Sequence, residues 1–291
     1  MKTPQFDYCA PDSLEEVLEL LAEHGDEAKI LAGGQSLVPL LALRLAGPSY
    51  LIDVNRVRSL ASIEDRGDVM AFGATVRERT AEQSASVRQK IPLLAEALPF
   101  IGHVAIRNRG TIGGSVAHAD ASAEIPAVTA ALDGSVVVRS VRGERVIAAA
   151  DFFQGHFSTA MDDDECLVEV QLPTSSAGTG WCFQEIARRH GDFALVAVAT
   201  TIALDSAGAI KDSRIAMVGV ADSPLRARAA EASLVGAMPT TETLAAAAQV
   251  ATDDLEPASD VHGSSAFRKQ LARVTVRRAL TQATQRAGAP A

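Results

Sequence analysis

Apolar residues recur at intervals of three and four between positions 13 and 24, and this period predicts an amphipathic helix near the start of the chain. One face of that helix carries four apolar side chains: Leu14, Val17, Leu18 and Leu21. Ser13 and Glu16 have the spacing of a capping box, and Gly25 is typical of the residue that ends a helix. The helix therefore has defined ends as well as a buried face.

Shorter apolar runs follow, separated by turn residues and by helical segments. Strands are predicted at residues 29–32, 50–54, 69–73, 136–139, 145–148 and 166–172, and helices at 92–100 and 125–132. Pro39 is expected near the start of a short helix, where its missing N–H does little harm, and Thr75 is expected to cap another. The first part of the chain therefore mixes α and β elements.

The pattern changes near residue 175. Segment 173–178 has the composition of a hinge or an exposed turn. Beyond it, the pattern predicts a three-stranded antiparallel sheet from residues 181–187, 193–204 and 210–220, followed by helices at 241–255 and 265–287. We therefore expect an α+β protein with two domains, residues 1–175 and 176–291.

Composition and charge exclude several partners. The 291 residues are 47% hydrophobic and 22% charged, as in an ordinary globular protein. A net charge of −9 with scattered basic residues argues against nucleic-acid binding. Residues 194–204 form the longest apolar stretch, well short of the ~20 residues that span a membrane. The N-terminus lacks the regions of a secretory signal, so we expect a cytoplasmic protein without a membrane span.

The cysteines carry no metal signature. Cys9, Cys166 and Cys182 are widely separated and show no CxxC spacing, so we expect neither an iron–sulfur cluster nor a structural zinc ion on this chain. The acidic run at residues 162–165 fits a solvated turn better than a metal site.

Two glycine-rich segments are the main candidates for function. The first is LAGGQSL at residues 31–37, and the second is RNRGTIGGS at 107–115, which continues to Asp120 and Glu124. Glycine allows close backbone approach, so successive N–H groups can converge on an anion. Neither glycine core contains Lys or Arg, which favours a dinucleotide held by backbone groups. The P-loop, the GxGxxG fingerprint, HExxH and GxSxG are all absent from the sequence.

Together, AGGQSL at 32–37 and RGTIGGSVAHADASAE at 109–124 closely resemble the signature of the FAD-binding medium subunits of molybdenum hydroxylases. This family includes carbon monoxide dehydrogenase flavoproteins, N-heterocycle hydroxylases such as quinoline 2-oxidoreductase, and the FAD segment of xanthine dehydrogenase. Segments 188–196 and 256–264 also resemble it, so the similarity covers the whole chain.

The resemblance implies an FAD-binding fold of the vanillyl-alcohol oxidase type, with two α+β subdomains split near residues 55–60, and a smaller C-terminal domain. It implies non-covalent FAD, with these residues in the binding site: Ala32, Gly33, Gly34, Gln35, Ser36, Leu37, Ile101, Gly110, Thr111, Ile112, Gly113, Gly114, Ser115, Ala117, Asp120, Glu124, Leu167 and Phe193. Glu124 would contact the nucleotide through a ribose hydroxyl, and Leu167 would lie near the isoalloxazine. Phe193 stands where many relatives carry Tyr, which removes a phenolic hydrogen bond.

The family also implies partners and a role. A large subunit would hold a molybdenum pterin and oxidise the substrate, and a small subunit would hold two 2Fe-2S clusters. The FAD of this chain would pass electrons to an external acceptor, so no catalytic side chain is required. The implied assembly is a dimer of heterotrimers, and the substrate class is N-heteroaromatic. The sequence leaves open the individual substrate and the acceptor, which could be NAD, oxygen, a quinone or a cytochrome.

Alternatives remain open at this level. The chain could be a self-contained flavin oxidase or enolpyruvyl reductase of the same superfold, although no proton donor for the flavin is evident. It could also be a nucleotide-sensing or scaffolding domain. Asp120 and Glu124 could form an acid–base pair, but capping and ribose binding fit them better. His118 fits a hydrogen-bonded loop histidine, and the pair at 188–189 is either a surface pair or faces FAD or a partner.

Overall fold

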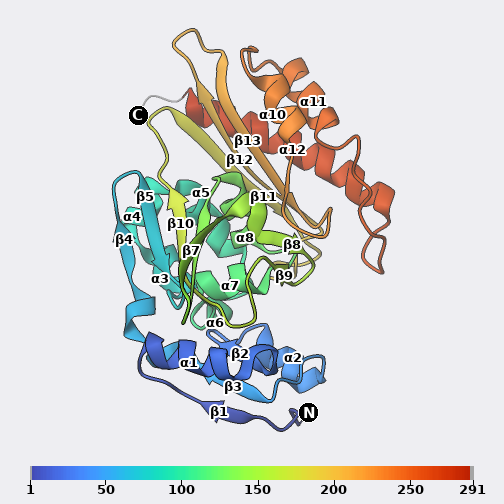
Figure 1. Cartoon of the computed structure of the whole chain (residues 1–291). Coiled ribbons are helices and arrows are strands. Elements are labelled where there is room, and N and C mark those ends of the chain that lie inside the picture. Colours follow the sequence, from blue (N-terminus) through green and yellow to red (C-terminus); the bar gives the residue numbers. More distant parts are fainter. Residues whose placement is uncertain (1, 289–291) are drawn as a thin grey trace.

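The computed structural model describes residues 2–288 of the chain. Three main sheets follow one another from the N-terminal end of the molecule, at the bottom of Figure 1, to the C-terminal end at the top. They contain three, five and four strands, and a fourth, two-stranded ribbon pairs β8 (Phe153–Gly155) with β9 (Ser158–Thr159). The chain therefore forms a mixed helix and strand fold.

The first sheet is parallel and has the order β1-β3-β2, with β1 at Asp7–Cys9, β2 at Ala28–Leu31 and β3 at Tyr50–Asp53. Helix α1 (Leu14–His24) buries the four predicted apolar side chains. The Ser13 hydroxyl accepts the N–H of Glu16, but the Glu16 carboxylate accepts the N–H of Asp12 instead of that of Ser13. Only half of the predicted capping box therefore forms. Helix α2 (Leu37–Leu43) contains Pro39 in its first turn, as predicted.

The middle sheet is antiparallel and has the order β4-β5-β10-β6-β7. Its strands are β4 (Ile63–Asp65), β5 (Val69–Gly73), β6 (Ser135–Ser140), β7 (Gly143–Ala148) and β10 (Cys166–Pro173). Residues 166–168 of β10 are all buried, and burial alternates from Val168 to Pro173, as expected where one face of the strand lies against the core. The pairing of β10 with β6 shifts register between Leu167 and Glu169.

Short helices surround the middle sheet. They are α3 (Glu78–Gln83), α4 (Ala85–Lys90), α5 (Pro92–Ala97), α6 (Val104–Arg107), α7 (Ile112–His118), α8 (Glu124–Ala131) and α9 (Ala149–Phe152). Four 3₁₀ turns complete this part: Gly25–Glu27, Val54–Arg56, Arg58–Ala61 and Leu98–Phe100. Thr75 caps no helix, contrary to prediction, because its N–H is bonded to the carbonyl of Leu60 at 2.8 Å and α3 starts only after Arg77.

The last sheet has the order β11-β12-β13-β14, with strands Thr179–Ile186, Val196–Leu204, Ile210–Val218 and Leu225–Arg226. The sequence predicts three of these strands and misses β14, which is too short to show a period. Helices α10 (Arg228–Leu234), α11 (Thr241–Val250) and α12 (Ser265–Ala287) cover one side of the sheet, as Figure 1 shows. The structure confirms the predicted limits of α12.

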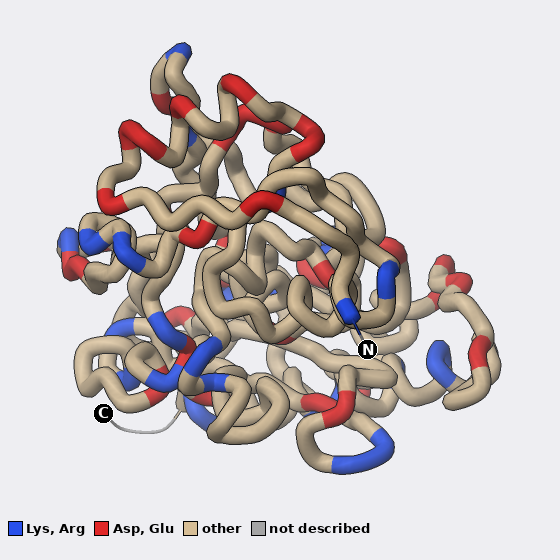
Figure 2. The backbone as a smooth tube through the Cα atoms, turned by 90° about the horizontal axis from the view of Figure 1, so that it is seen from below, with Lys and Arg blue, Asp and Glu red and all other residues tan. Residues whose placement is uncertain are grey.

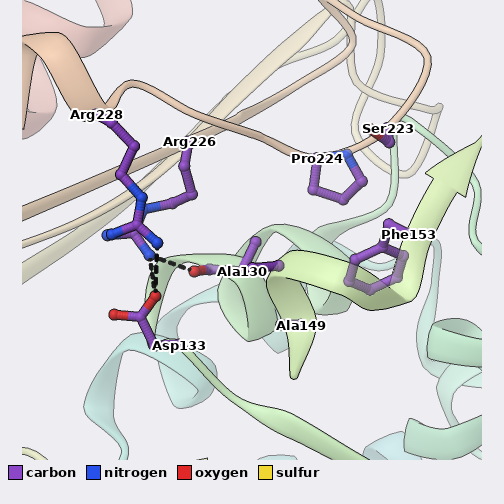
Figure 3. A pocket seen from close by; sticks show the side chains of 9 residues that line it. Ala130, Asp133, Ala149, Phe153, Ser223, Pro224, Arg226 and Arg228 are labelled. Carbon is purple, nitrogen blue, oxygen red and sulfur yellow. Dashed lines mark hydrogen bonds and ion pairs between the residues drawn. The ribbon is translucent and has the colours of Figure 1, made fainter. Parts of the chain in front are cut away.

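An ion-pair cluster ties the last sheet to the middle of the chain. Figure 3 shows Arg226 and Arg228 reaching towards Asp133, which follows α8. The Arg226 guanidinium also donates to the carbonyl of Ala130 at 2.7 Å and to both carboxylate oxygens of Glu231. A hollow of about 170 Å³ adjoins this cluster. Four of the five N–H donors of Arg226 are used, so the cluster fixes the position of β14 on α8.

Close packing of β11 against α12 leads to one prediction about stability. A Cβ atom at Gly180 would collide with the carbonyl oxygen of Ala283 and the backbone nitrogen of Ala287. Gly180→Ala should therefore lower the free energy of unfolding by about 1–3 kcal/mol, measured by urea denaturation. Gly288→Ala at the end of the same helix is the control, since its nearest new contact is 3.7 Å away. Equal stability of the two variants would contradict this packing.

Charged residues of both signs are spread along the chain, as Figure 2 shows. Between residues 2 and 288, no helix is long and apolar enough to cross a membrane, and no three metal-ligating side chains are grouped to hold a metal ion.

Candidate cofactor-binding site

The first glycine segment forms the turn between β2 and α2. Gly34 lies in the left-handed region with φ +73°, where glycine is favoured. In the described part of the chain, the N–H groups of Gly33, Gly34, Gln35 and Ser36 donate to no other residue. Four successive backbone donors are therefore free, at a turn that is only partly covered.

The two glycine segments touch each other. A Cβ atom at Gly33 would lie 2.6 Å from the carbonyl oxygen of Arg109 and 2.8 Å from the Cα of Gly110. Only glycine allows this approach, so the segments predicted to act together are brought together by the fold. A hollow of about 300 Å³ lies against the first segment and is lined by Leu31, Gly33, Gly34, Gln35, Val38, Pro39 and Arg109.

A series of hydrogen bonds from Arg77 links the two glycine segments. Its guanidinium donates to the carbonyl of Arg109 and to the side-chain oxygen of Asn55, both at 2.5 Å. The Asn55 amide in turn donates to the carbonyl of Ala32 at 2.9 Å. Burial, and then the charge of Arg109, lower the pKa of Arg77. Arg77 therefore positions both segments through its hydrogen bonds.

Arg109 is the exposed cation beside the free N–H groups. Its guanidinium lines the hollow and forms no hydrogen bond or ion pair with another residue between 2 and 288. The motifs in the sequence predict no role for Arg109, because it stands just outside the glycine core. An unpaired guanidinium next to free backbone donors is well suited to a phosphate.

The second glycine segment differs from the first in its hydrogen bonding. Thr111 caps α7, and its hydroxyl accepts the N–H of Gly114 at 3.0 Å. The N–H groups of Ile112 and Gly113 donate to the carbonyls of Val76 and Ala74. These donors are already used, and the side chain of Ile112 lies in the core. The second segment therefore shapes the site and supports the first segment. Among the described residues, its one free backbone donor between Gly110 and Ser115 is the N–H of Thr111, and the row of four free donors is on the first segment.

The other residues in the predicted set lie in different surroundings. Glu124 begins α8 and is 8% exposed, whereas Asp120 accepts the N–H of Ser122 in the preceding turn. Leu167 is buried at the register shift of β10. Phe193 lies between β11 and β12 and is 70% exposed, so it is free to cover a bound group. Ile101, Ser115 and Ala117 are partly buried, and the ring of His118 packs on Phe157.

Two further acidic residues, Glu78 and Glu185, lie near Glu124, and no sequence motif predicts either of them. Burial, and then Glu124, raise the pKa of Glu78 in α3 to about 8. Burial and Glu124 also raise the pKa of Glu185 in β11, and burial is the main cause of the raised pKa of Glu124. These residues come from three elements that are distant in sequence, so no local motif could reveal them.

The residues of the first segment fit the diphosphate of FAD. The free N–H groups lie beside the Arg109 guanidinium. At Gly33 and Gly34 the absence of a Cβ atom lets a ligand approach the backbone. FAD itself supplies a ring that exchanges one or two electrons. The chain holds and orients it.

Comparisons with known proteins agree with this site. The family described as "FAD binding domain in molybdopterin dehydrogenase" matches residues 4–175, and the "CO dehydrogenase flavoprotein C-terminal domain" matches residues 181–283. The alpha subunit of the 6-hydroxypseudooxynicotine dehydrogenase complex of Paenarthrobacter nicotinovorans is 44% identical over 99% of this chain and 97% of its own length.

Solved structures show the same fold. Carbon monoxide dehydrogenase of Hydrogenophaga pseudoflava matches with a TM-score of 0.96 and 40% identity, covering 98% of this chain and 99% of that one. Quinoline 2-oxidoreductase of Pseudomonas putida 86 matches with a TM-score of 0.94 and 41% identity, covering 99% of both. The fold and site define an FAD-binding oxidoreductase subunit. The chain belongs to the FAD-binding medium subunits of the molybdenum hydroxylase family.

The free guanidinium of Arg109 leads to a prediction about FAD affinity. Arg109→Gln should weaken FAD binding about tenfold at low salt, because a charge-assisted contact to phosphate is lost. The loss should shrink as ionic strength rises. Flavin fluorescence titration measures both effects. Arg58→Gln, an exposed arginine outside the hollow, is the control and should bind FAD like the wild type.

Proposed function

We propose that this chain holds FAD as the point at which electrons leave a molybdenum hydroxylase. The free N–H row from Gly33 to Ser36 beside Arg109 is the observation that carries the proposal. In this proposal, the free N–H groups and Arg109 hold the diphosphate of FAD and fix the position of the cofactor along the first glycine segment. Thr111 and Gly114 maintain the shape of the second segment, against which the first is packed.

The remaining members of the predicted set act on the rest of the cofactor in this proposal. Glu124 and Asp120 face the sugar and ribityl hydroxyls, Leu167 offers an apolar wall to the ring, and Phe193 covers it from the solvent side. The proposal assigns backbone and packing contacts to Ala32, Leu37, Ile101, Gly110, Ile112, Gly113, Ser115 and Ala117. The substitution of Tyr by Phe at position 193 leaves stacking intact and supplies no phenol.

The proposed partners are a large subunit with the molybdenum pterin and a small subunit with 2Fe-2S clusters, assembled as a dimer of heterotrimers. Electrons would pass from the small subunit to the FAD of this chain and then to an external acceptor. The name of the relative from Paenarthrobacter nicotinovorans, a subunit of a dehydrogenase complex, supports the presence of partner subunits. The cytoplasmic location predicted from the sequence stays a prediction. We also place the domain boundary at residues 175 and 176, and the division of the first domain near residues 55–60.

An N-heteroaromatic compound is the proposed substrate class of the complex. Two similar proteins carry names that refer to such compounds, 6-hydroxypseudooxynicotine and quinoline. The substrate would bind on the large subunit, so this chain's own residues do not select it.

Isolation of the complex tests the proposal. The chain would be tagged in its native host, purified with its partners, and assayed for flavin, iron and molybdenum. N-heteroaromatic substrates should bleach the flavin absorbance of the complex, and the same substrates should leave the isolated chain oxidised. A chain that purifies alone and whose own flavin is reduced by substrate would contradict the proposal and support a self-contained flavoenzyme.

A further inference from the structure

Three carboxyl groups meet beneath the second glycine segment. Glu78 from α3 is 4% exposed and Glu124 from α8 is 8% exposed, and Glu185 comes from β11 in the C-terminal part of the chain. The carboxyl groups of Glu124 and Glu185 lie close enough to affect each other's pKa. Two adjacent buried carboxyl groups avoid facing negative charges when one of them carries a proton, so this pair favours a protonated form.

Arg107 offsets the charge of the cluster only in part, because it lowers the pKa values of Glu78 and Glu124 but burial outweighs it. Arg107 is its nearest guanidinium, but that group is engaged by the Glu82 carboxylate at 2.9 Å and by the carbonyl of Ile101 at 2.9 Å. The other charged groups that face it add no positive charge: Asp120 lies before α8, and Glu96 of α5 is paired with Arg286. Arg79 of α3 is paired with Glu82. Ionising the cluster would therefore leave buried, incompletely compensated negative charge.

Two oxygens of the cluster have no hydrogen-bond partner. They are Oε2 of Glu78 and Oε2 of Glu185, both buried. Buried polar atoms without partners are rare in folded proteins and point to a missing partner or a stored proton. A proton on each group would relieve the charge, consistent with the raised pKa of Glu78, which burial and Glu124 move to about 8.

The cluster adjoins the candidate FAD site. The Glu78 carboxylate lies so close to Gly110 that a Cβ there would be 2.5 Å from its carboxyl carbon. On its other side Gly110 contacts Gly33, whose N–H begins the free donor row. One residue of backbone thus separates the buried carboxyls from the place where the diphosphate would be held. Both phosphates of FAD are ionised at neutral pH, so they add negative charge next to the cluster.

We propose that the cluster of Glu78, Glu124 and Glu185 takes up a proton from solvent when FAD binds, so that FAD affinity depends on pH. The inference rests on the proposed FAD site. The step is a simple protonation: a carboxylate accepts one proton from water, an O–H bond forms, and no electron moves. Arg109 faces the phosphates from the opposite side and offsets part of their charge, but it does not touch the carboxyls.

The sign of the pH dependence follows from linkage. Uptake of one proton on binding makes affinity fall about tenfold for each pH unit above the pKa of the cluster. Below that range the carboxyls are already protonated and affinity is constant. FAD affinity should therefore be level near pH 6 and should fall between about pH 8 and pH 9.

The same groups affect the stability of the chain without FAD. Their pKa values in the folded state lie above the value of about 4.3 in the unfolded state. At these groups the folded protein thus binds more protons, so their contribution to stability is fully present below about pH 4 and is lost as pH rises towards about 8. Replacing Glu78 and Glu185 by glutamine should raise Tm at pH 8 and leave the fold intact.

Calorimetric titration of the full chain with FAD, in buffers of different ionisation enthalpy, counts the protons. We expect uptake of about one proton at pH 8 for the wild type. The E78Q/E185Q variant should show little uptake and an affinity that hardly changes with pH. Glu19→Gln, an exposed glutamate on α1, should behave like the wild type. Infrared difference spectra of the FAD-free chain should show a protonated carboxyl band at pH 6 that the double variant has lost.

The outcomes distinguish the inference of proton uptake from the proposed function. Tight FAD binding without proton uptake, or proton release on binding, overturns the inference and leaves the proposed function standing. Uptake that persists in the double variant also overturns it, because the proton then goes elsewhere. A folded chain that binds no FAD at any pH refutes both.

Discussion

Replacing Gly33 by valine is expected to reduce FAD affinity by about 100-fold or more. Even the first side-chain atom would lie 2.6 Å from the carbonyl oxygen of Arg109, so the two glycine segments must separate. Separation moves the free N–H groups away from their common target and breaks the support from Arg77. Flavin fluorescence titration of the purified variant measures the loss.

The control for this variant is Gly47→Val, at an exposed position where a Cβ would be 3.9 Å from its nearest new neighbour. It should bind FAD like the wild type. Circular dichroism of both variants checks that the fold is kept. Wild-type affinity in a folded Gly33→Val protein would show that FAD does not depend on the contact between the segments.

Arg226→Met is expected to have the largest effect on stability, about 3–5 kcal/mol. The substitution leaves the side chain of Glu231, which is 8% exposed, without its main counter-ion. It also removes donors from Asp133 and from the carbonyl of Ala130, which link β14 to α8. Urea denaturation should show a lower midpoint for the variant.

A second substitution distinguishes loss of charge balance from loss of packing. Glu231→Gln, added to Arg226→Met, removes the uncompensated charge while an amide oxygen can still accept the N–H of Ile215. The double variant should regain a substantial part of the lost stability. If the double variant regained no stability, the unpaired charge of Glu231 would not be the cause of the loss. Arg58→Met, at an exposed position, is the control and should keep the stability of the wild type.

The sequence predicts the long elements well and the short ones poorly. Helix α12 extends over 23 residues rich in helix-favouring Ala, Leu, Arg and Gln, and its predicted limits are those observed. Helix α7 is not among the predicted helices, because its glycine and alanine residues give no amphipathic pattern. Strand β14 consists of two residues held by tertiary contacts with β13, which no local pattern encodes.

The same reasoning explains what was seen and missed at the site. The glycine segments were found because close backbone approach demands glycine, and that demand is visible in the residues themselves. Arg109, Glu78 and Glu185 were missed because their role depends on which neighbours are already paired. Glu185 approaches Glu124 only when the last sheet packs on α8, which brings together residues 61 positions apart in the chain.

The flavin content of the full chain tests the central claim most directly. The protein would be purified at pH 6.5, denatured, and the released cofactor identified by chromatography and quantified against the chain. The account predicts about one FAD per chain, either as purified or after addition of FAD, with none covalently attached. A folded chain that carries no flavin and does not bind added FAD would contradict the account.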